Sequence, residues 1–403
     1  MPMPSVTIIG AGPIGLEMAC RCVSSNFSVT LIEKEPTIAG NVHKWSSVNL
    51  FSPWSMNYSP RGLEILTELK VDHPKPDSYP TGKEYVEGYL DHIKSYLCSN
   101  ACPNFNLKLS TTLISSVRQN SPKTSMSSRS SSPFLLLLKD SNTNVEFHHK
   151  TDKLIDCSGT YSNPSPLGLS SQPALNERSL NSEITRSLNA EIPVGSKILL
   201  VGSGATAITF LKKIVEACEN ADNNVQTEVI WLTRRGKDEI YHRIPSDPLP
   251  QRDNLSVLAH TLLQNGGSNN LKLTHLQSEI LSLSKSPDQW TVGLTSRTTP
   301  TVTCSTIIGA TGFRPDTSIY SELQVHTCYA SEGPMKLAGY LLSQSGGGGG
   351  DCLSQVSPGP ELLRNPEEDF YVAGMKSYGR GSAFLIRIGL EQVDMIMGLL
   401  QGK

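Results

Sequence analysis

The stretch that decides the fold is Ser5-Val6-Thr7-Ile8-Ile9-Gly10-Ala11-Gly12-Pro13-Ile14-Gly15. It consists of a β-branched run, a glycine turn and the start of a helical stretch that continues to Val23. In such a setting the first glycine permits a tight turn, the second lets a pyrophosphate approach the backbone, and the third lets helix and strand pack closely. The phosphates would face the helix N-terminus. The stretch therefore predicts a dinucleotide-binding unit.

The next strand supports this prediction. Residues 29–33, Val-Thr-Leu-Ile-Glu, end in an acid about 20 residues after the glycines, where a carboxylate can accept both hydroxyls of an adenosine ribose. We therefore expect Glu33, together with the adjacent Lys34, to contact the nucleotide.

The same plan occurs a second time, at Lys197-Ile198-Leu199-Leu200-Val201-Gly202-Ser203-Gly204-Ala205-Thr206-Ala207. One such motif can be no more than a tight turn, but two copies between a strand and a helix are a stronger signal. The following strand ends in Arg234 and Arg235 instead of an acid. Two guanidiniums can hold a 2′-phosphate bidentately, so this unit is predicted to prefer NADPH. Alternatively, these arginines are solvated charges at a strand end.

Composition limits the other classes of function. The 403 residues include 35 Lys and Arg against 37 Asp and Glu, a net charge of −2, which argues against binding nucleic acid or an anionic membrane by bulk charge. The length suits two or three domains. No apolar stretch approaches the length of a membrane span, and the N-terminus runs into a strand without a cleavage signal. We expect a soluble, cytoplasmic protein.

Local patterns fix three further expectations. Nine cysteines without any C-x-x-C argue against a zinc site or a dithiol redox pair, and no metal is predicted. Cys352 is either an ordinary free thiol or a redox or metalloid-binding group. Residues 81–84, Thr-Gly-Lys-Glu, predict a capping box that opens a helix with one apolar face, and the serine-dense residues 115–133 predict a flexible surface insertion.

The two glycine motifs resemble those of the two-dinucleotide-domain flavoproteins, the group that contains flavin-containing monooxygenases and thioredoxin reductase-like enzymes. Residues 156–161 and 309–316 resemble the crossings between the two domains of that group. The resemblance implies an α/β fold of two Rossmann-like, three-layer ββα domains. An NAD(P)H-binding domain, residues 191–301, would be inserted in an FAD-binding domain, residues 1–190 and 302–403.

Three blocks, residues 48–54, 79–85 and 374–380, more narrowly resemble flavin monooxygenase-like bacterial oxidoreductases, some of them encoded beside arsenic-resistance genes. There are departures. The monooxygenase motif Phe-x-Gly-x-x-x-His is absent between the nucleotide motifs, and Gly374 is followed by Met375 instead of the acid that many reductases carry. The missing C-x-x-C removes the ordinary disulfide reductase mechanism.

The resemblance implies an FAD-dependent oxidoreductase in which NADPH reduces the flavin. The first hypothesis is a monooxygenase that uses O₂ and a flavin hydroperoxide to oxygenate a small substrate, with a homodimer as one arrangement. The second is a reductase of a thiol, quinone or metalloid, and the third is a non-catalytic nucleotide-binding regulator. The intact second glycine motif with its two arginines counts against the third.

The resemblance also places residues around the flavin. His43 is a candidate acid or base, or else a structural histidine. Lys376 and Arg380 could stabilise negative charge near a helix that begins at residues 381–383, or else they are a basic pair on the surface. Trp45 could stack on the flavin or wall its cavity, or else Trp45 and Trp54 are core aromatics. The predicted catalytic residues are His43, Lys376 and Arg380. The predicted cofactor-binding residues are Gly10, Gly12, Pro13, Ile14, Gly15, Glu33, Lys34, Gly40, Asn41, Trp45, Gly159, Gly202, Gly204, Ala205, Thr206, Arg234, Arg235, Thr311, Gly312, Gly374, Ser382 and Ala383.

Overall fold

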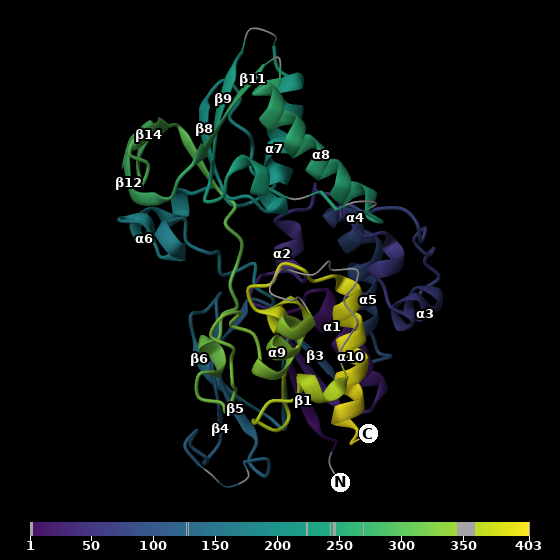
Figure 1. The fold of residues 1–403 in the computed structure, drawn as a ribbon. Helices are drawn as coiled ribbons and strands as arrows, with labels where there is room; N and C mark the ends of the chain where they lie inside the picture. Colours follow the sequence, from purple (N-terminus) through teal and green to yellow (C-terminus); the bar gives the residue numbers. More distant parts are fainter. Residues whose placement is uncertain are drawn as a thin grey trace. The chain divides into compact units, whose positions relative to one another are not determined.

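The computed structural model describes residues 3–125, 127, 129–222, 225–241, 243–244, 247–268, 270–344 and 359–402. The chain divides into two compact units, which are described separately (Figure 1). Unit 1 comprises Met1–Ser46, Ser52–Asn163 and Phe313–Lys403, and unit 2 comprises Ser47–Phe51 and Pro164–Gly312. Among the described residues, no helix has the length and apolar character needed to cross a membrane.

Unit 1 is built on a five-stranded sheet whose neighbouring strands all pair in parallel. The order is β16 (Phe370–Val372), β7 (Lys153–Asp156), β1 (Ser5–Ile9), β2 (Ser28–Ile32) and β3 (Phe105–Lys108). The apolar residues of β1 are buried on both faces, as expected for a central parallel strand. The carboxyl ends of β1, β7 and β16 therefore meet at one edge of the sheet.

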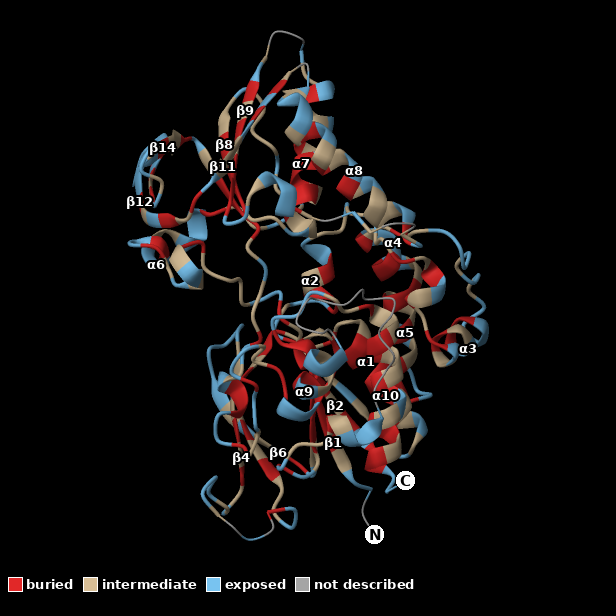
Figure 2. Cartoon of the chain, in the orientation of Figure 1, coloured by how far each residue is buried: buried red, intermediate tan, exposed pale blue. Residues whose placement is uncertain are grey.

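Helices cover one face of this sheet, and a second sheet covers the other (Figure 1). The helices are α1 (Pro13–Ser24), α5 (Asp91–Leu97) and α10 (Ile386–Leu400). The second sheet is antiparallel and consists of β4 (Thr111–Arg118), β5 (Phe134–Asp140) and β6 (Glu146–Thr151). Buried residues are dense in α1 and in the strands beside it (Figure 2). The core between the two sheets contains Ile9, Ile32, Leu113, Phe134, Leu136, Leu138, Leu154, Phe370 and Val372.

Unit 2 repeats this three-layer plan. Its main sheet has the order β10 (Gly267–Ser268), β11 (Leu271–Gln277), β9 (Thr227–Thr233), β8 (Lys197–Val201) and β15 (Thr306–Gly309), parallel except for β10. Helices α7 (Ala205–Glu219) and α8 (Pro250–Asn265) lie on one face. The antiparallel strands β12 (Ile280–Ser286), β13 (Gln289–Leu294) and β14 (Thr301–Cys304) lie on the other.

Five further α-helices lie in the described residues. They are α2 (Gly40–His43), α3 (Pro60–Glu68), α4 (Gly82–Tyr85), α6 (Glu177–Leu180) and α9 (Met335–Gln344). The predicted capping box at α4 is confirmed, since Thr81 Oγ1 accepts from the Glu84 amide and Glu84 Oε2 accepts from the Thr81 amide. A π-helical turn, Val86–Leu90, joins α4 to α5. The predicted apolar face of this helical stretch is buried at Val86, Leu90, Ile93 and Leu97.

The boundary between the units differs from the predicted domain boundary. Residues 164–190 belong to unit 2 because short bridges attach them to its strands, at Leu175 with Ser282 and at Thr185 with Ile308. Leu167, Ala174 and Ile184 also join its core. No local periodicity marks this segment, so no sequence pattern assigns it to unit 2.

The serine-dense stretch is not a surface insertion throughout. Its first residues, through Arg118, continue β4, and the Arg118 and Arg129 side chains are each at most 3% exposed. Both pair with the buried carboxylate of Glu367, at 2.8 and 3.1 Å. A distant acid has therefore ordered part of a segment whose composition predicts flexibility.

Candidate dinucleotide-binding sites

The glycine turn after β1 explains its own composition. Gly10 has φ +95°, and a Cβ there would lie 2.7 Å from Ser158 Cα. A Cβ at Gly15 would lie 1.8 Å from the Gly10 carbonyl oxygen, so helix and turn can approach only with glycine at this position. A Cβ at Gly12, in contrast, would meet nothing within 4 Å. Gly12 therefore borders open space into which a ligand could fit close to the backbone.

Helix α1 begins at this open space. Gly12 is its extended N-cap residue, no side chain caps the helix, and Pro13 occupies the first turn. A helix N-terminus without a capping side chain presents backbone N–H groups and the positive end of the helix dipole, which favours a phosphate. Ile14 belongs to the same turn but is buried, and its side chain packs against Gly374.

Glu33 lies directly against the glycine turn. Its Oε2 accepts from the Ala11 amide at 2.8 Å and its Oε1 accepts from the Glu35 amide at 3.0 Å. The residue is 8% exposed, and burial raises the pKa of its carboxyl, an effect that the two backbone N–H donors oppose. Each carboxylate oxygen can accept a further hydrogen bond, so the group can still bind ribose hydroxyls. Lys34 is exposed beside it.

Lys376 is not a surface residue. Its Nζ lies 2.6 Å from Asp156 Oδ2, both side chains are 1% exposed, and it also donates to Ser158 Oγ at 3.1 Å. Asp156 in turn accepts from the Ser158 amide and hydroxyl. The surface interpretation of Lys376 is therefore wrong: the side chain ties the end of β7 to the turn after β16. Arg380 lies elsewhere, in an outer ion pair with Glu332 at 2.5 Å.

The turn after β16 is held from α10. Gly374 has φ +73°, and its amide donates to Gln392 Oε1 at 2.8 Å. Gln392 is fully buried and donates to Ser377 Oγ, which donates to the Gly374 carbonyl. Sequence reasoning missed Gln392, which belongs to no recognisable motif, and it assigned no role to Ser377, although this residue lies in the block of residues 374–380.

The predicted helix start near residue 381 is wrong. Helix α10 begins at Ile386, with Leu385 as its extended N-cap residue, so Ser382 and Ala383 lie before the helix in irregular backbone. Leu385 is 3% exposed, and its burial fixes where the helix can begin. The first turn of α10 therefore does not contain the residues predicted to face the flavin.

The segment around α2 is attached to the glycine turn by the Ala39 amide, which donates to the Ala11 carbonyl. A Cβ at Gly40 would lie 2.4 Å from Glu35 Cγ, so the absence of a side chain at Gly40 leaves room for the Glu35 side chain. Asn41 accepts from Lys44 and donates to Ser162, while His43 is exposed. The three predicted catalytic residues therefore have different surroundings: His43 is exposed, Lys376 is buried against Asp156, and Arg380 pairs with Glu332.

The two tryptophans have different surroundings. The Trp45 indole packs against Gly82, where a Cβ would lie 2.7 Å from the ring, and its buried Nε1 has no hydrogen-bond partner. Trp54 is 7% exposed and makes an edge contact with Tyr85, so it is a core aromatic. Trp45 thus retains a donor that a ligand could use.

Beside β7, Gly159 offers a second opening in unit 1. It has φ +67°, and a Cβ there would meet nothing within 4 Å. The neighbouring Thr160 hydroxyl is buried without a partner. Both residues follow the carboxyl end of a strand, the edge at which parallel sheets bind ligands.

The cysteines around the first glycine turn are buried. Cys157, which directly follows β7, is buried, and burial raises the pKa of its thiol well above the ordinary value; burial likewise raises the pKa of Cys22 to about 12. Cys328 differs, because the Ser331 amide lowers the pKa of its thiol. Cys352 lies outside the described residues. Within the described chain, no group of three or more His, Cys, Asp or Glu could hold a metal.

The glycine turn of unit 2 has the same geometry as the first. Gly202 has φ +123°, and a Cβ there would lie 2.2 Å from the Ala310 carbonyl oxygen, whereas one at Gly204 would meet nothing within 4 Å. Gly204 is the N-cap residue of α7, which begins at Ala205 and continues through Thr206. Ala207 is fully buried where the third glycine stands in unit 1.

Arg234 and Arg235 follow β9 with exposed side chains. Arg234 Nη1 donates to Ser171 Oγ at 3.3 Å. Thr311 and Gly312 lie in the segment that leaves unit 2, where Thr311 Oγ1 and the Gly312 carbonyl both bond to the Ser165 backbone.

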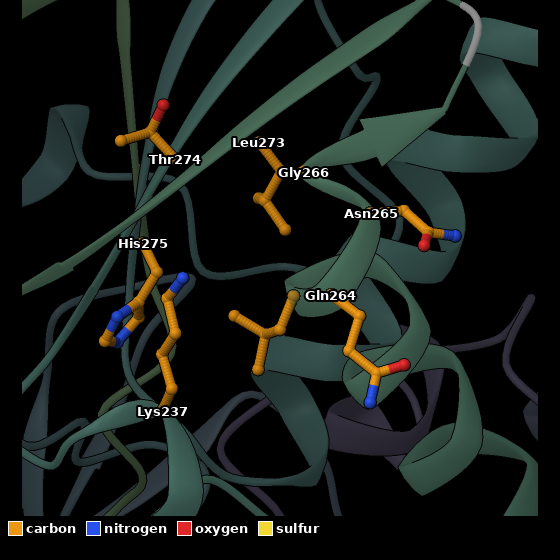
Figure 3. A pocket seen from close by; sticks show the side chains of 8 residues that line it. Lys237, Gln264, Asn265, Gly266, Leu273, Thr274 and His275 are labelled. Carbon is orange, nitrogen blue, oxygen red and sulfur yellow. The ribbon is translucent and has the colours of Figure 1, made fainter.

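A cavity of about 330 Å³ lies in unit 2 (Figure 3). None of the predicted cofactor-binding residues lines it. The lining residues are Lys237, Leu263, Gln264, Asn265, Gly266, Leu273, Thr274 and His275.

Comparisons with known proteins agree with this architecture. Residues 8–67 match the NAD(P)-binding Rossmann-like domain family. No curated protein sequence matches the chain. Among solved structures, bacillithiol disulfide reductase from Bacillus cereus is similar, with a TM-score of 0.65 at 13% identity over 100% of this chain and 99% of that one.

Two further solved structures are similar over their whole length. Ornithine N-hydroxylase from Kutzneria sp. 744, determined with reduced FAD, NADP⁺ and L-ornithine, has a TM-score of 0.61 at 12% identity over 100% of both chains. Thioredoxin reductase from T. acidophilum has a TM-score of 0.57 at 13% identity over 98% of both. These likenesses confirm the predicted fold class of two Rossmann-like domains.

Proposed function

We propose that the chain is an FAD-dependent oxidoreductase that takes its electrons from NADPH. The observation that carries this proposal is the pair of glycine turns. The two turns have the same geometry, but the side chains that follow the next strand have opposite charge in the two units. In unit 1 the turn contacts the carboxylate of Glu33, whereas in unit 2 two exposed arginines follow the neighbouring strand. An acid selects a ribose with free hydroxyls, and arginines select one that carries a phosphate.

The residues of unit 1 fit FAD. Gly12 and the N-terminus of α1 would hold the pyrophosphate, and Glu33 would hold the adenosine ribose. The opening at Gly159 would admit a further part of the cofactor, and Trp45 Nε1 could donate a hydrogen bond to it. Bound FAD would supply the two-electron redox chemistry, and the chain would orient it and exclude water. In unit 2, Gly204, Ala205 and Thr206 would hold the NADPH pyrophosphate.

Within this class we favour a monooxygenase that acts on a small substrate with O₂. The supporting observation concerns the thiols around the first glycine turn: burial raises the pKa of Cys157 and of Cys22, and a buried thiol with a raised pKa is a poor nucleophile. The FAD- and NADP-bound ornithine N-hydroxylase shows that the same fold serves oxygenation in another protein. The link to arsenic-resistance genes stays a prediction.

The test is to reduce the purified protein with NADPH anaerobically and mix it with O₂ in a stopped-flow instrument. A monooxygenase should reoxidise in two spectrally distinct phases, and product should accumulate in proportion to NADPH consumed once the substrate is present. Single-phase reoxidation that releases one H₂O₂ per NADPH, with every substrate tried, would contradict the monooxygenase proposal but leave the FAD and NADPH assignment intact.

The alternative is a reductase, and one residue favours it. The thiol of Cys328 has a lowered pKa because the Ser331 backbone amide stabilises the thiolate. Similar folds include disulfide reductases. If Cys328→Ser abolishes turnover but leaves flavin reduction by NADPH at the wild-type rate, the reductase alternative is correct.

A further inference from the structure

The Thr233 side chain stands directly before the arginine pair and has two hydrogen-bond partners. Its Oγ1 lies 2.6 Å from the Arg235 carbonyl oxygen and 2.8 Å from His275 Nε2, and the residue is 2% exposed. A hydroxyl carries one proton, which the carbonyl must receive because a carbonyl cannot donate. Thr233 Oγ1 therefore accepts its second bond from His275 Nε2–H, which assigns the proton of the neutral imidazole to Nε2.

The bond belongs to a set that holds the whole backbone of the arginine turn. The Ser278 amide donates to the Thr233 carbonyl at 3.0 Å, and Gln277 Nε2 donates to the Arg234 carbonyl at 3.3 Å. The Thr233 hydroxyl, held by His275, donates to the Arg235 carbonyl. Gln277 and Ser278 thus bind two of three successive carbonyls, and the Thr233 hydroxyl, held by His275 of β11, binds the third, while both arginine side chains stay exposed.

The surroundings of His275 suit a fixed, neutral donor. Its ring makes an edge contact with Trp231 at 6.4 Å between centroids, and the Lys237 side chain lies beside it (Figure 3). Burial, together with the positive charge of Lys237, lowers the pKa of the imidazole. The β9–β11 register pairs His275 with Trp231, and Trp231 stands two residues before Thr233 on β9. The pairing of the two strands therefore explains why the His275 ring contacts Trp231.

We infer that His275 is a positioning residue for the arginine pair: through the Thr233 hydroxyl it fixes the backbone from which Arg234 and Arg235 reach a 2′-phosphate, and so it sets the preference for a phosphorylated ribose. This inference rests on the proposed NADPH site. A restrained backbone lowers the conformational entropy that the two arginines lose when they bind, which is how a residue without ligand contact can change selectivity.

The experiment uses two probes that differ only in the phosphate. The full-length protein with its bound FAD is titrated with 2′,5′-ADP and with 5′-AMP by calorimetry, and selectivity is the ratio of the two dissociation constants. His275→Leu and Thr233→Val each remove the bond between the side chains. Each should reduce selectivity about five- to tenfold with little change in 5′-AMP binding. The double variant should lose no more than either single variant.

Three controls separate the explanations. His275→Gln supplies an amide donor and should restore most of the selectivity, which a purely structural loss would not allow. Thr233→Val keeps the shape of the side chain and tests the bond if His275→Leu does not fold. If the variant carrying both Arg234→Ala and Arg235→Ala keeps wild-type selectivity, the proposed NADPH site is wrong; if it loses selectivity while His275→Leu and Thr233→Val keep it, the inference about His275 is wrong.

Discussion

Lys376 and Asp156 show what a single buried pair can do at a strand edge. The pair joins the turn after β16 to the end of β7, and Ser158 binds both partners. Removing one member of a buried ion pair leaves a charge without compensation, which is far more costly than losing a surface pair. The residue predicted as catalytic therefore has a position that suits organising the site better than proton transfer.

Replacing Lys376 with Met should lower the free energy of unfolding by about 3–5 kcal/mol, because the Asp156 carboxylate would stay buried without a positive charge beside it. Adding Asp156→Asn should recover much of this loss, since no buried charge remains. Urea denaturation measures both. Arg380→Met, which removes the outer pair with Glu332, is the control and should cost about 1 kcal/mol or less. Equal losses for Lys376→Met and Arg380→Met would contradict the buried-pair argument.

Glu33→Ala should weaken FAD binding by about 1.5–3 kcal/mol, equivalent to roughly 10- to 150-fold in dissociation constant. The reason is the loss of a charge-assisted acceptor for the ribose and for the Ala11 amide. Flavin fluorescence after extensive dialysis measures retention. Glu35→Gln, a neighbouring acid that pairs with Lys44, is the matched control. Full FAD occupancy in Glu33→Ala would show that Glu33 does not hold the ribose.

At the scale of elements, α1 combines two tasks. Its N-terminus faces the open space at Gly12, and its body is buried between the sheet and α10. One buried position of the helix carries an acidic side chain. Glu17 is 5% exposed, and its Oε2 accepts from the Ser59 hydroxyl at 2.7 Å. Ser59 Oγ in turn accepts from the Gly62 amide at the start of α3. Burial is the main cause that raises the pKa of Glu17, against the Ser59 hydrogen bond.

Glu17→Gln should therefore stabilise the fold, and the gain should depend on pH. A raised pKa means that the folded state binds the proton more tightly than the unfolded state, so ionisation lowers the free energy of unfolding as pH rises from the ordinary carboxyl pKa through the raised value. The amide keeps the Ser59 contact without a charge. We expect a gain of about 1 kcal/mol near pH 8 that shrinks toward pH 5.

Urea denaturation across this pH range measures the gain. Exposed Glu64 on α3 is the control, and its Gln variant should show no comparable pH-dependent gain. A stabilisation by Glu17→Gln that is the same at both ends of the range would contradict the assignment of the cost to ionisation.

At the scale of the whole molecule, the thiols bear on which acceptor would take the electrons from a reduced flavin. Eight cysteines fall in the described residues, all as free thiols, and those beside the first glycine turn have raised pKa values. A dithiol relay needs an attacking thiolate and a resolving partner. Monooxygenase chemistry at a flavin needs neither.

A Cys352→Ser variant should therefore keep wild-type rates of flavin reduction and of NADPH-dependent substrate turnover, within about twofold. Stopped-flow absorbance measures the reduction step, and steady-state product formation measures turnover separately. Cys157→Ser, at a buried thiol, is a control for packing. Normal reduction with abolished turnover in Cys352→Ser would overturn the monooxygenase proposal in favour of a thiol or metalloid reductase.

Most of the fold could be predicted because its decisive features are local. A glycine turn between a strand and a helix is recognisable from a dozen residues, since backbone conformation and close approach depend on immediate neighbours. The capping box at α4 was predictable for the same reason. The start of α10 was not, because Leu385 is fixed by burial in a core that distant segments complete.

The sequence by itself determined the two glycine turns, the acid after one and the arginines after the other. Only the tertiary structure decided that residues 164–190 belong to unit 2, that Lys376 is buried against Asp156, and that His275 binds Thr233. Each of these depends on partners far apart in the chain. Such contacts form where the packing of sheets and helices brings distant polar groups together and excludes water, a condition that no local pattern encodes.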